Sequence, residues 1–243
     1  MSASFAPALS AAREAASHQH YPQGALFVVA TPIGNLADIT LRALHVLALV
    51  DAVACEDTRH TQQLLRAYGI ERPGAQLLAV HQHNEAEAAG AVIDHLRHGL
   101  RIAYVSDAGT PAVSDPGARL VAAVRAAGLP VVPLPGASSI TTLLSAAGMT
   151  QEGGFVFAGF LPTKAAERER AVLLLAAEPR AVVLLEAPHR IEALAGALAA
   201  LGERPVTFGR ELTKQFEDIV TLPAMDGPAW LAGDANRLRG EFV

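Results

Sequence analysis

The chain has 243 residues, of which 51% are apolar and 18% are charged. This composition excludes an intrinsically disordered protein, and the length suits one large domain or two small ones. A formal net charge of −5 gives no general attraction to nucleic acid, so such a partner must meet a local basic surface. The lone cysteine, Cys55, excludes an internal disulfide and a multi-cysteine metal site, and the expected compartment is the cytoplasm.

The N-terminal residues are rich in Ala and Ser and lack the apolar core of a signal peptide. We therefore predict a disordered tail over residues 1–23. The longest uncharged stretch, residues 126–151, is interrupted by three prolines and three glycines, which excludes a single membrane-crossing helix.

From Ala25 onward, short β-branched or Leu-rich runs alternate with helical patterns. Strands are predicted at Leu26–Ala30, Ala52–Cys55, Leu77–Val80, Ile102–Val105 and Val131–Leu134. A helix is expected after each strand, with Asp38 and Asn84 as N-caps and Gly99, Gly128 and Gly148 as terminators. Five such units in a row predict an α/β domain with a parallel sheet covered on both faces, over residues 24–149.

A second α/β domain is predicted over residues 150–243, after the Gly-rich boundary at Gly148–Gly154. Its strands are expected at Phe155–Phe160, Ala181–Glu186, Pro205–Arg210 and about Asp218–Leu222, and a last one opens at Gly240–Val243. Helices are expected at about Ala165–Ala177 and Ile191–Leu201, with a short one near Trp230.

Ligands of open parallel sheets bind beyond the carboxyl ends of the strands, where loops and helix N-termini gather. The five loops that should meet there are rich in Gly, Pro, hydroxyl and carboxylate residues; they are residues 31–35, 56–60, 81–85, 106–117 and 135–139. Neither a G-x-x-x-x-G-K-[ST] phosphate loop nor a G-x-G-x-x-G after the first strand is present, so ATPase and ordinary dinucleotide-enzyme functions are disfavoured. The long fourth loop could wrap an uncharged or zwitterionic ligand, although Asp-Pro-Gly and Gly-Thr-Pro are equally typical of plain turns.

Eight ordered motifs resemble one branch of the tetrapyrrole methylase superfamily, the bacterial 16S rRNA cytidine 2′-O-methyltransferases. The motifs are Val29–Thr40, Glu56–Arg59, His81–Glu85, Ser106–Pro111, Pro135–Ser139, Phe160–Pro162, Glu186–Arg190 and Gly209–Lys214. The resemblance implies a two-domain class III methyltransferase with a mixed-sheet C-terminal domain, usually a homodimer. S-adenosylmethionine (SAM) would bind between the domains, and the substrate would be 16S rRNA or the small ribosomal subunit. Members of the branch usually complete the strand that opens at Gly240 and continue beyond it, so we expect the C-terminal domain here to lack its last strand and an extension.

The resemblance also implies roles for individual residues. The cofactor pocket would be shaped by Pro32, Gly34, Ser106, Asp107, Ala108, Gly109, Thr110 and Pro111, with Ser138 and Ser139 on the methionine carboxylate. The two serines could equally serve as plain helix caps.

Deprotonation of a ribose hydroxyl calls for a base, and Glu56 and Asp57 are the candidates, with His83 behind them. Asp57 could equally cap the following helix. His81 and His83 resemble half of a metal site, but no third ligand has suitable spacing, so we expect no metal.

RNA contacts are expected from cations near the site, namely Arg59, Lys164, Arg168, Arg190 and Lys214. By default each is an ordinary solvated surface charge. Two alternatives stay open: a tetrapyrrole C-methyltransferase of the same fold, and a non-catalytic SAM-binding relative.

Overall fold

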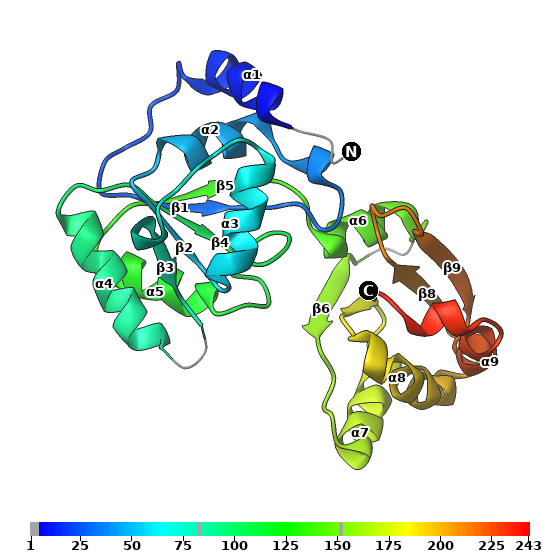
Figure 1. The fold of residues 1–243 in the computed structure, drawn as a ribbon. Helices are drawn as coiled ribbons and strands as arrows, with labels where there is room; N and C mark the ends of the chain where they lie inside the picture. Colours follow the sequence, from blue (N-terminus) through cyan, green and yellow to red (C-terminus); the bar gives the residue numbers. More distant parts are fainter. Residues whose placement is uncertain (1–4, 82–83, 151–152) are drawn as a thin grey trace. The chain divides into compact units, whose positions relative to one another are not determined.

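The structure is a computed structural model that describes residues 5–81, 84–150 and 153–243. Two compact units divide the chain, residues 1–138 and 139–243, and each is described by itself (Figure 1). The division lies before the predicted boundary at 149/150, because helix α6 (Ser139–Ala146) packs within the second unit, where Leu143 lies against Gly209. No helix in the described ranges is long and apolar enough to cross a membrane.

A five-stranded sheet organises the first unit. Its strands are β1 (Leu26–Val29), β2 (Ala52–Cys55), β3 (Leu77–Ala79), β4 (Ile102–Val105) and β5 (Val131–Leu134). All pairings are parallel and the order is β3-β2-β4-β1-β5, which confirms the predicted parallel sheet.

Helices cover both faces of this sheet (Figure 1). They are α2 (Leu41–Leu49), α3 (Thr58–Ala67), α4 (Glu85–Arg97) and α5 (Gly117–Ala126), with 3-10 turns at Leu36–Asp38 and Gly74–Gln76. Alternate strand residues face opposite layers: Phe27 and Val29 pack with α2 and α3, whereas Leu26 and Val28 pack with α4 and α5. The three inner strands β1, β2 and β4 are buried on both sides, which is why they are continuous apolar runs.

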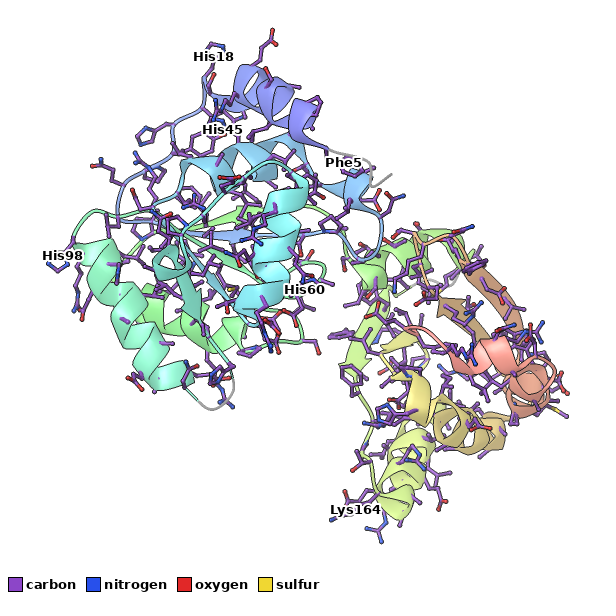
Figure 2. All side chains as sticks on the ribbon, in the orientation of Figure 1. Phe5, His18, His45, His60, His98 and Lys164 are labelled. Atoms are coloured by element: carbon purple, nitrogen blue, oxygen red, sulfur yellow. The ribbon has the colours of Figure 1, made fainter. Side chains whose placement is uncertain are left out.

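The predicted disordered tail is wrong over part of its length. Helix α1 (Ala6–Ala16) begins with Pro7 in its first turn and packs against α2, with Ala12 and Ala16 buried. Phe5 lies against the ring of Tyr68, at a centroid distance of 5.9 Å (Figure 2). The small side chains of Ala12 and Ala16 allow α1 to pack closely against α2, and no sequence motif predicts this contact.

Two predicted helix caps also differ. Thr40, not Asp38, caps α2, because its hydroxyl accepts from the Ala43 N–H at 3.1 Å while Asp38 lies in a preceding 3-10 turn. Asn84 does hold the N-cap position of α4, but its side-chain oxygen accepts from the His81 N–H instead.

The second unit contains two small sheets. Strands β6 (Phe155–Gly159) and β7 (Ala181–Leu184) are parallel, whereas β8 (Pro205–Arg210) and β9 (Asp218–Pro223) are antiparallel. The helices are α6, α7 (Ala165–Ala176), α8 (Ile191–Leu198) and α9 (Gly227–Ala232), with 3-10 turns at Pro188–Arg190, Ala199–Leu201, Ala224–Asp226 and Ala235–Leu238. Phe242 forms single bridges to Glu186 and Arg210 and so connects the two sheets.

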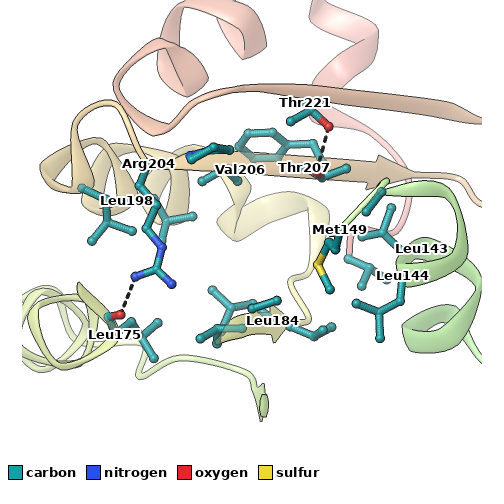
Figure 3. Close-up of a pocket in the computed structure, with 18 of the residues that line it drawn as sticks. Leu143, Leu144, Met149, Leu175, Leu184, Leu198, Arg204, Val206, Thr207 and Thr221 are labelled. Carbon is teal, nitrogen blue, oxygen red and sulfur yellow. Dashed lines mark hydrogen bonds between the residues drawn. The ribbon is translucent and has the colours of Figure 1, made fainter. Parts of the chain in front are cut away.

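A cavity of about 600 Å³, lined by apolar side chains and by a few charged ones, lies between β7 and β8 in this unit (Figure 3). Leu143 and Leu144 of α6 line it together with Leu184 and Val206. At one end Arg204 donates a hydrogen bond to the Leu175 carbonyl of α7 (2.8 Å). The cavity therefore lies wholly within the second unit, between its two small sheets and α6.

Candidate cofactor and catalytic site

The carboxyl ends of the five parallel strands meet at one edge of the sheet. Because β1 lies between β4 and β5, the loops that follow these three strands are neighbours in space. The loop after β2 adjoins the loop after β4 for the same reason. The predicted convergence of the loops thus follows from the strand order and direction.

Hydrogen bonds join three of these loops into one assembly. Thr31 and Gly109 exchange backbone hydrogen bonds of 2.9 and 3.0 Å, and the Thr110 hydroxyl donates to the Ala137 carbonyl at 3.0 Å. Gly109 has φ +78°, and a Cβ there would lie 3.2 Å from Ile33 Cγ2. A side chain is therefore disfavoured both by the backbone conformation and by the space.

The predicted cofactor-binding residues of the first unit lie in and beside this assembly. Buried members are Pro32, Ser106, Gly109 and Pro111, Thr110 is half-buried, and Gly34, Asp107 and Ala108 are exposed. The Ser106 hydroxyl donates to the Ala108 carbonyl at 3.2 Å. The loop therefore has a buried base and an exposed rim. Ser138 precedes α6 and Ser139 begins it; both are half-buried.

Glu56 follows β2 and is half-buried. Burial raises the pKa of its carboxyl, and the nearby carboxylates of Asp107 and Asp115 raise it further. Within the described part of the chain, no Lys, Arg or His forms an ion pair with it. An acid with a raised pKa and no neutralising partner has the properties of a proton acceptor.

Asp57, the next residue, caps α3. Its Oδ1 accepts from the N–H groups of Arg59 and His60, at 2.8 and 3.3 Å. These hydrogen bonds to the carboxylate hold the pKa of Asp57 below its usual value. Of the two carboxylates, Glu56 is thus the better suited to take up a proton.

Neighbouring residues contribute less. His83 lies outside the described residues. Burial raises the pKa of the Cys55 thiol to about 11, so the thiol is protonated and unreactive at neutral pH. Nowhere in the described ranges do three His, Cys, Asp or Glu side chains gather as metal ligands would.

Two of the five predicted RNA-binding cations project into solvent. Arg59, on the first turn of α3, has a side chain that is 89% exposed. Its Nε lies 3.8 Å from Oδ1 of Asp57. Lys164 extends from the start of α7 and pairs with Glu167 at 3.1 Å (Figure 2).

The other three are held by partners inside the second unit. Arg190 Nε lies 3.0 Å from Oε1 of Glu186, whose side chain is only 2% exposed, and Arg190 also donates to the Leu161 carbonyl. Arg168 donates to the Thr163 carbonyl, and Lys214 pairs with Glu211 and Glu241. The geometry favours structural roles for these three cations.

Tyr104 and Asp115 were not among the predicted site residues, yet they hold the second half of the loop after β4. The Tyr104 hydroxyl donates to Asp115 Oδ1 at 3.0 Å, and Asp115 also accepts two backbone N–H groups. The available signal was the position of Asp115, two residues before the start of α5, which is typical of a side chain that accepts from a turn.

The sequence was compared with protein-family models and with curated proteins, and both comparisons found relatives. The family model of Tetrapyrrole (Corrin/Porphyrin) Methylases matches residues 25–226. Two similar curated proteins are both named ribosomal RNA small subunit methyltransferase I. The one from Pseudomonas aeruginosa is 49% identical over 222 residues, 90% of this chain and 77% of that protein. The one from Vibrio cholerae is 50% identical over 226 residues, 91% and 77% of the two chains.

Solved structures share the fold at lower identity. The X-ray structure of cobalt precorrin-4 methyltransferase, a cobalamin biosynthetic enzyme, aligns with a TM-score of 0.62 at 20% identity, covering 92% of this chain and 96% of the other. Uroporphyrin-III C-methyltransferase from Thermus thermophilus, complexed with S-adenyl homocysteine, aligns with a TM-score of 0.56 at 20% identity, covering 84% and 90%. At this identity the likeness concerns the fold alone.

Proposed function

This chain belongs to the tetrapyrrole methylase family, and we propose that it is a SAM-dependent methyltransferase acting on ribosomal RNA of the small subunit. The observation that carries the proposal is the 49% and 50% identity to proteins of that name across nine-tenths of the chain. In keeping with the motif resemblance, we infer that the acceptor is the ribose 2′-hydroxyl of a decoding-centre cytidine in 16S rRNA. We also infer that the protein acts in the cytoplasm and forms a homodimer.

The interlocked loops of the first unit fit a SAM pocket. Gly109 lets the loop after β4 pack closely against Ile33 in the loop after β1, and the exposed rim at Asp107 and Ala108 offers a carboxylate beside polar backbone groups. Thr31 and Ser106 place hydroxyls at the buried base. Ser138 and Ser139, at the start of α6, would meet the methionine carboxylate, because a helix N-terminus favours negative charge. When bound, SAM supplies an electrophilic methyl group on a positively charged sulfur.

Glu56 would accept the proton of the ribose hydroxyl. A free hydroxyl is a weak nucleophile at neutral pH, so removal of its proton as the new C–O bond forms lowers the barrier. The raised pKa of Glu56 makes its carboxylate a stronger base than an ordinary glutamate. Asp57 would then serve to fix the start of α3, and Arg59 on the same turn would contact RNA phosphate.

The experiment that tests the function uses SAM with an isotopically labelled methyl group. Purified protein is incubated separately with naked 16S rRNA, with small ribosomal subunits and with uroporphyrinogen III, and the products are analysed by mass spectrometry. We expect label on a single cytidine ribose of the ribosomal substrate. Label on the macrocycle alone would overturn the assignment and establish the tetrapyrrole alternative, which the fold of the two solved relatives keeps open. SAM binding with no product on any substrate would identify a non-catalytic relative.

A further inference from the structure

The loop between β4 and α5, residues 106–117, is held in two separate halves. The first half is tied to the neighbouring loops by the Thr31–Gly109 backbone pair and by the Thr110 hydroxyl on the Ala137 carbonyl. None of these bonds reaches beyond Thr110. The second half therefore needs an anchor of its own.

Asp115 provides that anchor with both carboxylate oxygens. Oδ1 accepts from the Tyr104 hydroxyl at 3.0 Å and from the Gly117 N–H at 2.8 Å, and Oδ2 accepts from the Ala112 N–H at 2.7 Å. Three donors on one carboxylate fix its orientation closely, because hydrogen bonds to a charged acceptor are the strong ones.

Ala112 is the strained point of the loop. Its φ is +66°, in the left-handed region that an alanine seldom adopts. The Asp115 carboxylate binds the N–H of this same residue, so it stabilises the conformation that the backbone disfavours. Strained residues held by their surroundings often belong to binding sites.

The anchor itself rests on the core. Tyr104 lies on β4 and is fully buried, and its ring occupies the space where a Cβ on Gly117 would stand. Asp115 thus links a rigid strand to the strained turn, and the turn is continuous with the stretch from Ser106 to Pro111. A shift at Ala112 would be passed directly to Pro111.

We propose that Asp115 is a positioning residue for SAM binding: it holds Ala112 in its left-handed conformation and so fixes the shape of the loop 106–111 that contacts the cofactor. The inference rests on the proposed function, since it takes that loop as part of the SAM pocket. Asp115 need not touch the cofactor, because its bonds act through the backbone of the turn. Tyr104 supports it from the sheet.

The test compares SAM affinity with thermal stability in a small set of variants. Asp115→Asn keeps the size of the side chain but replaces one acceptor oxygen with an NH₂ group, which cannot accept the hydrogen bond that one of the two backbone N–H groups donates. We expect SAM binding, measured by calorimetry on the folded protein, to weaken by about 10-fold or more. Asp94→Asn, an exposed change on α4, is the matched control and should bind as the wild type does.

Rescue provides the readout that a merely structural role would not give. Glycine adopts the left-handed region freely, so adding Ala112→Gly to Asp115→Asn should restore SAM affinity to within about 3-fold of the wild type. Should Asp115→Asn fail to fold, Tyr104→Phe retains both backbone bonds of Asp115 and should weaken SAM binding by about 3-fold.

The outcomes separate this inference from the proposed function. A wild-type chain that does not bind SAM would overturn the function itself. A wild type that binds SAM, together with Asp115→Asn or Tyr104→Phe binding equally well, would overturn the role of Asp115 and leave the function standing. Weakened binding that Ala112→Gly does not restore would equally reject it.

Discussion

The two units differ in which of their charged motif residues form ion pairs. In the first unit, helices cover both faces of a continuous parallel sheet, and Glu56 at its carboxyl edge forms no ion pair within the described residues, although the adjacent Asp57 lies within 3.8 Å of Arg59. In the second unit, the sheets are small and a cavity lies between them, and the motif residues Glu186 and Lys214 form ion pairs, Glu186 with Arg190 and Lys214 with Glu211 and Glu241.

The comparison is sharpest between two motif glutamates. Glu56 has a raised pKa and no ion pair in the described part of the chain, whereas Glu186 is buried against Arg190 at 3.0 Å. An unpaired acid on a rigid sheet edge is suited to chemistry, and a paired one to holding the fold. Resemblance to a motif does not by itself distinguish the two roles.

Changing the unpaired glutamate should give the largest effect. Glu56→Gln removes the proposed base while keeping its shape, so methyl transfer at saturating SAM should fall by about 10²–10⁴-fold. SAM affinity and melting temperature should stay close to those of the wild type. The control is Asp57→Asn, which preserves the helix cap because asparagine caps as well as aspartate does. If Asp57→Asn loses the activity and Glu56→Gln retains it, the two roles are reversed.

Removing the ion pair between Arg190 and Glu186 should lower the free energy of unfolding instead. Arg190→Ala leaves Glu186 buried without its counter-ion, which costs about 3–5 kcal/mol of unfolding free energy in buried pairs. Chemical denaturation measures this cost. Arg59→Ala, at an 89% exposed side chain, should change stability by less than about 0.5 kcal/mol and yet slow methylation of ribosomal substrate. An Arg190→Ala variant as stable as the wild type would refute the structural role of that pair.

Substitution of two glycines tests how freely the neighbouring side chains can move in each unit. A Cβ on Gly117 would overlap the fully buried ring of Tyr104, so Gly117→Ala should destabilise by about 1–3 kcal/mol. A Cβ on Gly209 would lie 2.6 Å from Leu143 Cδ1, the flexible end of a side chain that borders the cavity of about 600 Å³. Gly209→Ala should therefore cost less than about 1 kcal/mol. Equal losses in denaturation experiments would show that the cavity gives Leu143 no freedom.

The pH profile should show the smallest of these effects. The proposed base works only when ionised, and burial together with Asp107 and Asp115 raises the pKa of Glu56. Methyl transfer should consequently decline as the pH falls through a value above the ordinary glutamate pKa, and Asp107→Asn should move that decline to lower pH. A profile that Asp107→Asn leaves in place would argue that Glu56 is not the titrating group.

Much of the first unit was predictable because its signals are local. Strands β2, β4 and β5 have the predicted bounds; β2 and β4 are buried along their whole length, and all three are short, largely apolar runs bounded by polar loops. Parallel direction then requires the loops after the strands to meet at one edge, so the location of the candidate site followed before any contact was known. The individual roles of Pro32, Gly34, Ser106–Pro111, Ser138 and Ser139 remain predictions.

Other features depend on partners that sequence spacing does not indicate. Helix α1 is stable in place because Ala12 and Ala16 pack closely, whereas their composition alone resembles a disordered tail. Thr40 displaces Asp38 as the cap of α2, since the path of the chain places its hydroxyl at the Ala43 N–H. Asp57 was predicted equally well as a base or a cap, and only the hydrogen bonds to Arg59 and His60 favour the cap.

The amino-acid sequence by itself determined the strand–helix alternation, the direction of the sheet and the edge at which function should be sought. Apolar periodicity and turn residues act over a few positions, and this is enough to specify such features. Only the tertiary structure decided which charges are neutralised: Arg190 meets the Leu161 carbonyl across 29 residues of chain, and Asp115 meets the hydroxyl of a buried tyrosine. Whether a charged side chain serves chemistry or stability depends on its burial and its partner, and both are set by packing between distant segments.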